Sequence, residues 1–219
     1  MSANEPSSLI IGIDLSGPSN PADTVVSLFS EYTDRLEYIG HYEHCSDADI
    51  VRLLEKASSH LHVTIGLDAP LSYQDGGGDR MSDRSLRKVL MGAGMPSGTV
   101  MTPTMTRMAY LTLRGITIAR LLRSLHADAN IVEVHPHGSM ALAGAPIELV
   151  RTMKAEAASR QGLAHWLGSQ GLARLPEGPH SDHVIASIGC AFAAWLWQTG
   201  RSTWKAAAIP PHHPFDFAC

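Results

Sequence analysis

The stretch LIIGIDLSGP, residues 9–18, ends an apolar run on one acidic side chain, Asp14, and then turns at Gly17 and Pro18. A short continuous apolar run bounded by turn residues is typical of a buried strand. Two later stretches repeat the arrangement: HVTIGLDAPLS, residues 62–72, carries Asp68, and ANIVEVHPHG, residues 129–138, carries Glu133. The sequence therefore predicts three buried strands that each carry a carboxylate near the carboxyl end.

The remaining elements follow from residue spacing. Two runs rich in β-branched and aromatic residues predict two further strands within residues 23–33 and 35–45. Ser46 and Asp49 have the spacing of a capping box and begin a helical pattern, and Ser181 is the expected N-cap of a strong final helix. Apolar spacing predicts helices over residues 46–60, 82–91, 108–125, 146–172 with breaks, and 181–200.

The order of these elements sets the expected topology. The second and third acidic strands each follow a helix, so each is reached by a crossover and should run parallel to a neighbour. The simplest arrangement is an α/β fold with a mixed five-stranded sheet in the order 3-2-1-4-5, flanked by helices. The three acidic strands are then parallel neighbours, and open α/β sheets place their binding sites at the carboxyl ends of such strands.

Four carboxylates are expected at that edge of the sheet. They are Asp14, Asp68, Glu133 and Asp182, which lies in the first turn of the final helix on the side of Ile185. One acid at a strand end is most simply a turn or cap residue, and Asp182 alone would interact favourably with the helix dipole. Several buried acids without partners are costly, however. Mg²⁺ or Mn²⁺ would relieve their repulsion, and two such ions could promote phosphodiester hydrolysis.

Positive charge gathers in one segment of an acidic chain. The net charge is −4, which argues against a protein that coats nucleic acid, yet residues 80–125 hold eight arginine or lysine residues and one acid. This segment overlaps an irregular, basic insertion expected at about residues 72–107. Arg84 and Arg87 lie one helical turn apart and are candidate phosphate contacts, as are Lys154 and Arg160. A solvated helix face explains the arginines equally well.

Other site classes receive less support. The three cysteines show no CxxC spacing, and the 12 histidines show no HExxH motif, so a zinc site is disfavoured. His135 and His183 would lie near the acids, either as proton-transfer groups or as ordinary structural histidines. The first ten residues lack the pattern of a signal peptide, and the longest apolar stretch is too short to cross a bilayer, so we expect a cytoplasmic protein without a membrane partner.

The motifs IIGIDLSGP, IGLDAPLS, DRSLRKVL, VEVHPHGSM and SDHVIASIGCAFAAW, in this order and spacing, resemble the DUF429 family. That family is described as predicted nucleases of the ribonuclease H-like superfamily, and the resemblance spans roughly residues 8 to 200. It implies a single ribonuclease H-like domain over residues 1–219 with a metal-dependent phosphodiesterase site at Asp14, Asp68, Glu133 and Asp182. His183 stands where many members of the family carry a further acid, so the chain departs from the family's pattern at the second metal position.

Two functions therefore remain open. The first is metal-dependent hydrolysis of a nucleic acid, DNA or RNA, with Asp14 and Asp68 as the principal ligands of Mg²⁺ or Mn²⁺. The second is a non-catalytic ribonuclease H-like module that binds a nucleotide, a nucleic acid or a protein. Crowded carboxylates favour the enzyme, because a binding module does not need them. The sequence leaves the oligomeric state open.

Overall fold

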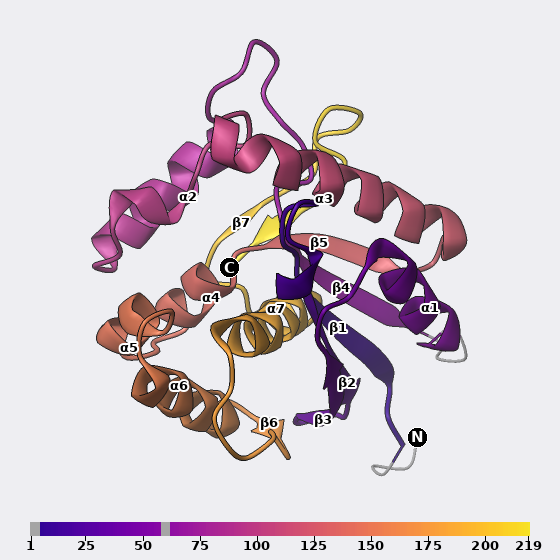
Figure 1. Ribbon diagram of the computed structural model, residues 1–219, viewed down its shortest axis with the longest axis vertical. Coiled ribbons are helices and arrows are strands. Elements are labelled where there is room, and N and C mark those ends of the chain that lie inside the picture. The colour runs from indigo at the N-terminus through magenta and orange to yellow at the C-terminus, as the bar shows by residue number, and fades with distance from the viewer. Residues whose placement is uncertain (1–4, 58–61) are drawn as a thin grey trace.

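A computed structural model describes residues 5–57 and 62–219 (Figure 1). The first four residues and the predicted helical positions 58–60 lie outside the described residues. The strands are β1 (Ser8–Asp14), β2 (Val25–Glu31), β3 (Leu36–Tyr42), β4 (Val63–Asp68), β5 (Asn130–Val134), β6 (Leu172–Ala173), β7 (Lys205–Ala206) and β8 (Phe217–Ala218). The helices are α1 (Asp47–Ala57), α2 (Met81–Gly92), α3 (Thr106–Leu125), α4 (Pro136–Leu142), α5 (Ile147–Thr152), α6 (Ala157–Ser169) and α7 (Asp182–Gln198). Two 3-10 turns are η1 (Pro21–Asp23) and η2 (Ser97–Thr99).

The α/β class and the mixed sheet are confirmed, but the predicted strand count is wrong. The described residues form an eight-stranded sheet in the order β6-β3-β2-β1-β4-β5-β8-β7. The five predicted strands keep their relative order, and three two-residue strands extend the two edges, so the complete order differs from the predicted one. Strands of two residues carry no periodicity, and their pairing depends on where a distant segment docks.

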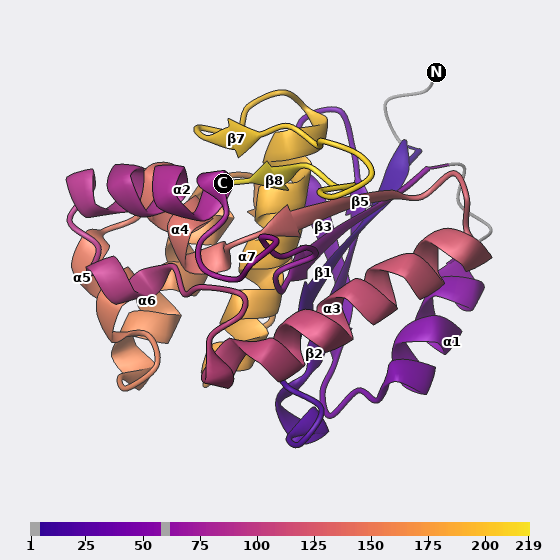
Figure 2. The same cartoon turned by 90° about the horizontal axis from the view of Figure 1, so that it is seen from above.

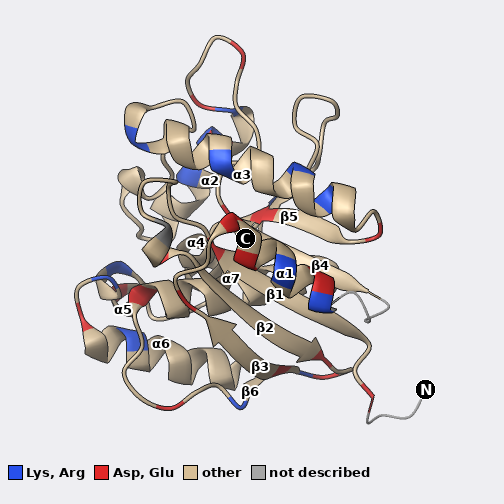
Figure 3. Ribbon diagram, turned by 45° about the vertical axis from the view of Figure 1, so that its right-hand side comes forward, with Lys and Arg blue, Asp and Glu red and all other residues tan. Residues whose placement is uncertain are grey.

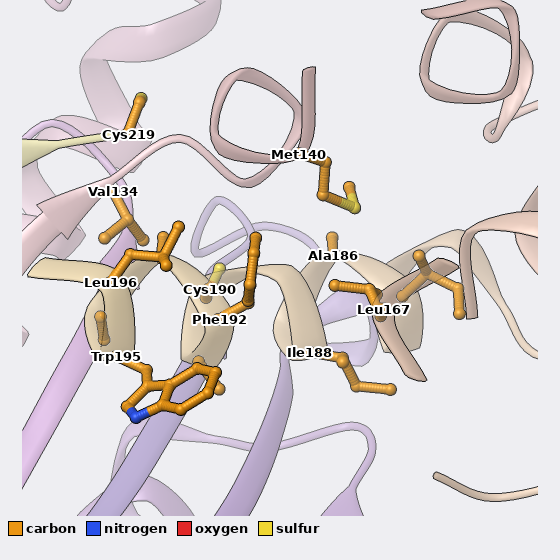
Figure 4. Close-up of a cluster of buried hydrophobic side chains, with 14 of the residues drawn as sticks. Val134, Met140, Leu167, Ala186, Ile188, Cys190, Phe192, Trp195, Leu196 and Cys219 are labelled. Carbon is orange, nitrogen blue, oxygen red and sulfur yellow. The ribbon is translucent and has the colours of Figure 1, made fainter. Parts of the chain in front are cut away.

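Helices cover both faces of the sheet (Figures 1 and 2). One face packs against α7, with α2, α4, α5 and α6 around it, and the other face packs against α1 and α3. Figure 4 shows the core around α7, in which Phe192, Trp195 and Leu196 lie among side chains of neighbouring elements, such as Val134 and Met140. Trp195 is therefore part of the core.

Two glycines bring α7 onto the sheet. Gly12 of β1 and Gly66 of β4 are register partners in the parallel pair. A Cβ atom at Gly12 would overlap the backbone of Ser187 and Ala191, and one at Gly66 would overlap the backbone of Cys190. The helix can rest directly on the two strands only because both positions lack a side chain, and its first turn then lies beside the carboxyl end of β1.

The predicted helix starts are confirmed by their hydrogen bonds. Asp49 N donates to Ser46 Oγ at 3.2 Å while Ser46 N donates to the Asp49 carboxylate at 2.9 Å, as a capping box requires. Val184 N donates to Ser181 Oγ at the start of α7. Helix α4 was not predicted, although Pro136 at its first position is a recognised start signal. None of the helices within the described ranges is long and apolar enough to span a membrane.

Candidate active site

Asp14 and Asp68 form an acid pair at the edge of the sheet. They are direct register partners at the ends of the parallel strands β1 and β4. Adjacent strands lie about 4.8 Å apart, so the two side chains leave the sheet side by side. The sequence prediction that these acids meet is confirmed by the strand pairing.

Burial and mutual repulsion act on this pair. Burial raises the pKa of Asp14, although the hydrogen bond from His183 partly opposes this. The pKa of Asp68 is raised well above its ordinary value, first by burial and then by the negative charge of Asp14. Two adjacent carboxylates in this environment resist holding two negative charges without a cation. The pair is therefore suited to binding a positive charge.

His183 holds one side of the acid pair. Its Nδ1 lies 2.7 Å from Asp14 Oδ2, and its Nε2 lies 3.7 Å from Asp23 Oδ2. The hydrogen bond to Asp14 raises the pKa of His183. This contact fixes the orientation of the Asp14 carboxylate.

Asp182 precedes His183 in the first turn of α7. It is partly exposed, it does not line the pocket described below, and its charge acts on Asp14 only at longer range. The structure thus brings His183, rather than Asp182, into contact with the acid pair. A role for Asp182 as a ligand stays a prediction.

Glu133 is near the pair but is held by an arginine. Both of its oxygens accept from Arg80: Nη1 reaches Oε2 at 2.8 Å and Nη2 reaches Oε1 at 2.5 Å. The backbone N–H of Leu71 also donates to Oε2 at 2.9 Å. Arg80 in turn binds Asp83 through Nη2 and Nε. Glu133 is therefore neutralised within a buried network, and in this arrangement it has less to offer a metal ion than Asp14 or Asp68.

A pocket of about 620 Å³ opens above the acids. Asp14, Asp68 and Glu133 line it together with His183, which makes the strand ends its floor. The segment between α2 and α3 and the start of α3 supply apolar lining. Lys154 follows α5 and also lines the pocket, and its positive charge acts on both Asp14 and Asp68.

The other three predicted phosphate contacts do not line the pocket. Arg87 donates to both Asp79 oxygens and to the carbonyl oxygen of Val100, so it fastens the loop before α3. Arg160 donates to the carbonyl oxygens of Met153 and His180. Arg84 is exposed on α2, where Figure 3 shows basic segments. These three arginines do not line the pocket, whereas Lys154 does.

Two histidines of the HPH motif also line the pocket. His135 Nε2 bonds the carbonyl oxygen of Thr99 at 2.9 Å, and its Nδ1 accepts from Gly138 N at 3.0 Å, so this ring caps α4 and is fixed. His137 is partly buried, and burial lowers its pKa to about 3. It is neutral at pH 7 and is a pocket residue that the sequence did not single out.

The donor set of the described residues fits one divalent cation better than two. Within residues 5–57 and 62–219, no three acidic, histidine or cysteine side chains are grouped closely enough to hold a metal ion by themselves. Mg²⁺ is often held by one or two carboxylates and completed by waters and substrate oxygens. Asp14 and Asp68 supply two carboxylates of this kind.

Comparison with known proteins gives one result. No curated protein and no solved structure matches the chain. Residues 12–212 match the family described as "Protein of unknown function (DUF429)". This match covers both members of the acid pair, Glu133, Lys154 and His183. On the extent of that match, the chain belongs to the DUF429 family.

Proposed function

We propose that this protein is a metal-dependent phosphodiesterase that acts on nucleic acid, with one Mg²⁺ or Mn²⁺ ion held by Asp14 and Asp68. The observation that carries the proposal is the pairing of these two partly buried carboxylates in register at the floor of a pocket. The strand run β3-β2-β1-β4-β5, with acids at the ends of β1 and β4, also supports a ribonuclease H-like fold.

The residues around the pair have distinct tasks in this proposal. A bound divalent ion supplies Lewis acidity toward a phosphoryl oxygen and lowers the pKa of water. His183 fixes the orientation of Asp14 through its 2.7 Å contact. Lys154 lines the same pocket and offers a positive charge to the phosphate group. Together they place a phosphodiester between the acid pair and a lysine.

In this proposal, Glu133 and Asp182 are not ligands of the metal ion. Glu133 anchors Arg80 and the start of the loop after β4 through three hydrogen bonds. Asp182 lies at the first position of α7, where a negative charge interacts favourably with the helix dipole. We therefore propose one metal ion instead of two.

A second candidate is a non-catalytic module that binds a nucleotide, a nucleic acid or a protein. The pairing of Glu133 with Arg80 favours it, because that pairing removes a third carboxylate from the acid pair. The crowding of Asp14 and Asp68 opposes it. A module that only binds anions gains nothing from two adjacent acidic side chains at the floor of its pocket.

Metal binding and cleavage, measured on the same folded protein, separate the two candidates. Mn²⁺ binding is measured by calorimetry, and cleavage is measured with labelled single-stranded, duplex and hybrid substrates in Mg²⁺, Mn²⁺ and EDTA. We expect wild type to bind Mn²⁺ and to cleave only with metal, and Asp14→Asn and Asp68→Asn to lose both activities. The matched control is Asp128→Asn, which changes an exposed acid between α3 and β5. Folded wild-type protein that neither binds Mn²⁺ nor cleaves any substrate would refute the proposal.

A further inference from the structure

The pocket over the acid pair has the dimensions of a site for one nucleotide, not those of a groove for a long duplex. Its volume is about 620 Å³, within the usual range of small-molecule sites. The carboxylates at its floor are withdrawn from the surface: the Asp14 side chain is 13% exposed and that of Glu133 is 6% exposed. A phosphodiester in the middle of a stiff duplex would have to descend into this pocket to reach them.

In the described residues, the pocket lining offers one cationic side chain without an ion pair, which is enough for one phosphate group. Arg80 is occupied by Asp83 and Glu133, and Arg151 pairs with Glu148 at 3.1 Å. In the described part of the chain, no carboxylate oxygen lies within ion-pair distance of Lys154. A protein that grips a long backbone neutralises many phosphates with exposed basic side chains, so a lining with one unpaired cation suits one phosphate.

The rest of the lining suits the apolar face of a base. Met95, Val100, Met101, Met108 and Leu111 line the pocket, and they come from one continuous segment between α2 and α3 and the first turns of α3. Arg87 fastens this segment by donating to the carbonyl oxygen of Val100. Methionine side chains are polarizable and make favourable contacts with aromatic rings. In the described residues, the pocket thus combines an acid pair, one cation without an ion pair and an apolar wall.

We infer that the substrate enters as the terminal nucleotide of a chain, with its phosphodiester between Lys154 and the acid pair. Its base lies on the apolar wall formed by Met95, Val100, Met101, Met108 and Leu111. The inference rests on the proposed function. In the reaction, water adds its oxygen to phosphorus, the ester P–O bond to the neighbouring nucleotide breaks, and the departing oxygen takes the proton that water releases. One nucleotide leaves at each cycle, so the protein requires a free end.

Two pairs of substrates test this inference in Mn²⁺. The first pair is a linear single strand and the closed circle of the same sequence, prepared as DNA and as RNA. The second pair is thymidine 5′-(p-nitrophenyl phosphate) and methyl p-nitrophenyl phosphate, which share a leaving group and differ in the nucleoside. We expect the linear strand to be degraded and the circle to stay intact. We also expect kcat/KM for the thymidine ester to be higher by about tenfold or more, because the base buries apolar surface.

Two matched methionine variants test whether the preference for the thymidine ester depends on the apolar wall. Met101 lines the pocket and Met105 does not, and both are 41% exposed. We expect Met101→Ala to lower the preference for the thymidine ester by about threefold to tenfold, as the loss of part of an apolar contact predicts. Met105→Ala should leave the preference unchanged.

The outcomes separate this inference from the proposed function. Metal-dependent cleavage of the esters that is lost in Asp14→Asn, together with opening of the circle at a rate close to that of the linear strand, would overturn the inference and retain the phosphodiesterase. An equal fall in the preference in both methionine variants would also overturn it. Failure of wild type to cleave any of these substrates would refute both the proposed function and the inference.

Discussion

Replacing Arg80 by methionine tests the buried network beneath the pocket. Arg80 is 4% exposed in its side chain, and it neutralises Asp83 and Glu133, which are 1% and 6% exposed. Methionine keeps an apolar stem of similar length but removes the cation and all of its donors. Two carboxylates would then be buried without an ionic partner.

The expected loss follows from this burial. Breaking a buried ion pair by removing one partner destabilises a protein by about 3–5 kcal/mol, because the remaining charge is not compensated. Since Glu133 keeps its hydrogen bond from Leu71 N, we expect Arg80→Met to lower the free energy of unfolding by a value in that range instead of the sum for two pairs. Adding Glu133→Gln removes one uncompensated charge, so the double variant should recover part of the loss.

Urea unfolding at pH 7 measures the effect, with Arg52→Met as the control. Arg52 pairs with Asp49 at the surface, where the two side chains are 65% and 38% exposed. Exposed pairs contribute about 0–1 kcal/mol, so the control should change stability little. If Arg80→Met were as stable as Arg52→Met, or if Glu133→Gln gave no recovery in the Arg80→Met background, the network would not have the electrostatic role proposed for it.

Three further predictions concern the helix contact, the loop and the acid pair. Gly66→Ala should lower stability by about 1–3 kcal/mol in thermal unfolding because its Cβ overlaps α7, whereas Gly40→Ala, with open space around it, should be nearly neutral. The hydrogen bond from Arg87 lowers the pKa of Asp79 from 3.8 to about 2, so ionised Asp79 stabilises the fold above pH 3.8 and this contribution is lost as the pH falls through about 2. In urea unfolding, the stability advantage of wild type over Asp79→Asn should therefore disappear within that pH window. A difference in stability that does not change with pH would contradict the assignment. His183→Gln should weaken Mn²⁺ binding by about 10–100-fold in calorimetry, and unchanged affinity would exclude its role in orienting Asp14.

The central strands were predictable because their sequences contain strong local signals. Each of β1, β4 and β5 is a short apolar run that ends near an acid and a turn, and the helices between them require parallel crossovers. The meeting of Asp14 and Asp68 follows from that topology alone. The edge strands β6, β7 and β8 were not predictable, since two residues cannot show a period and their partners lie far away in the sequence.

The contacts of the site were harder to predict because they depend on side-chain direction. Arg80 and Glu133 are 53 positions apart, and no spacing rule connects a residue at the start of α2 to one on β5. The sequence placed Asp182 toward the acids from its spacing to Ile185. The structure instead directs His183 to Asp14, because one step along a helix turns the side chain by about 100°.

That last contact depends on two residues without side chains. Gly12 and Gly66 allow α7 to touch β1 and β4 directly, and this close approach sets both the height and the rotation of the helix over the sheet. A helix held one side-chain layer farther away would carry His183 out of reach of Asp14, whatever residue stood at position 183. The orientation of the acid pair is therefore a consequence of how the core packs. A site of this kind is specified by glycines that never touch a ligand as well as by the acids that would.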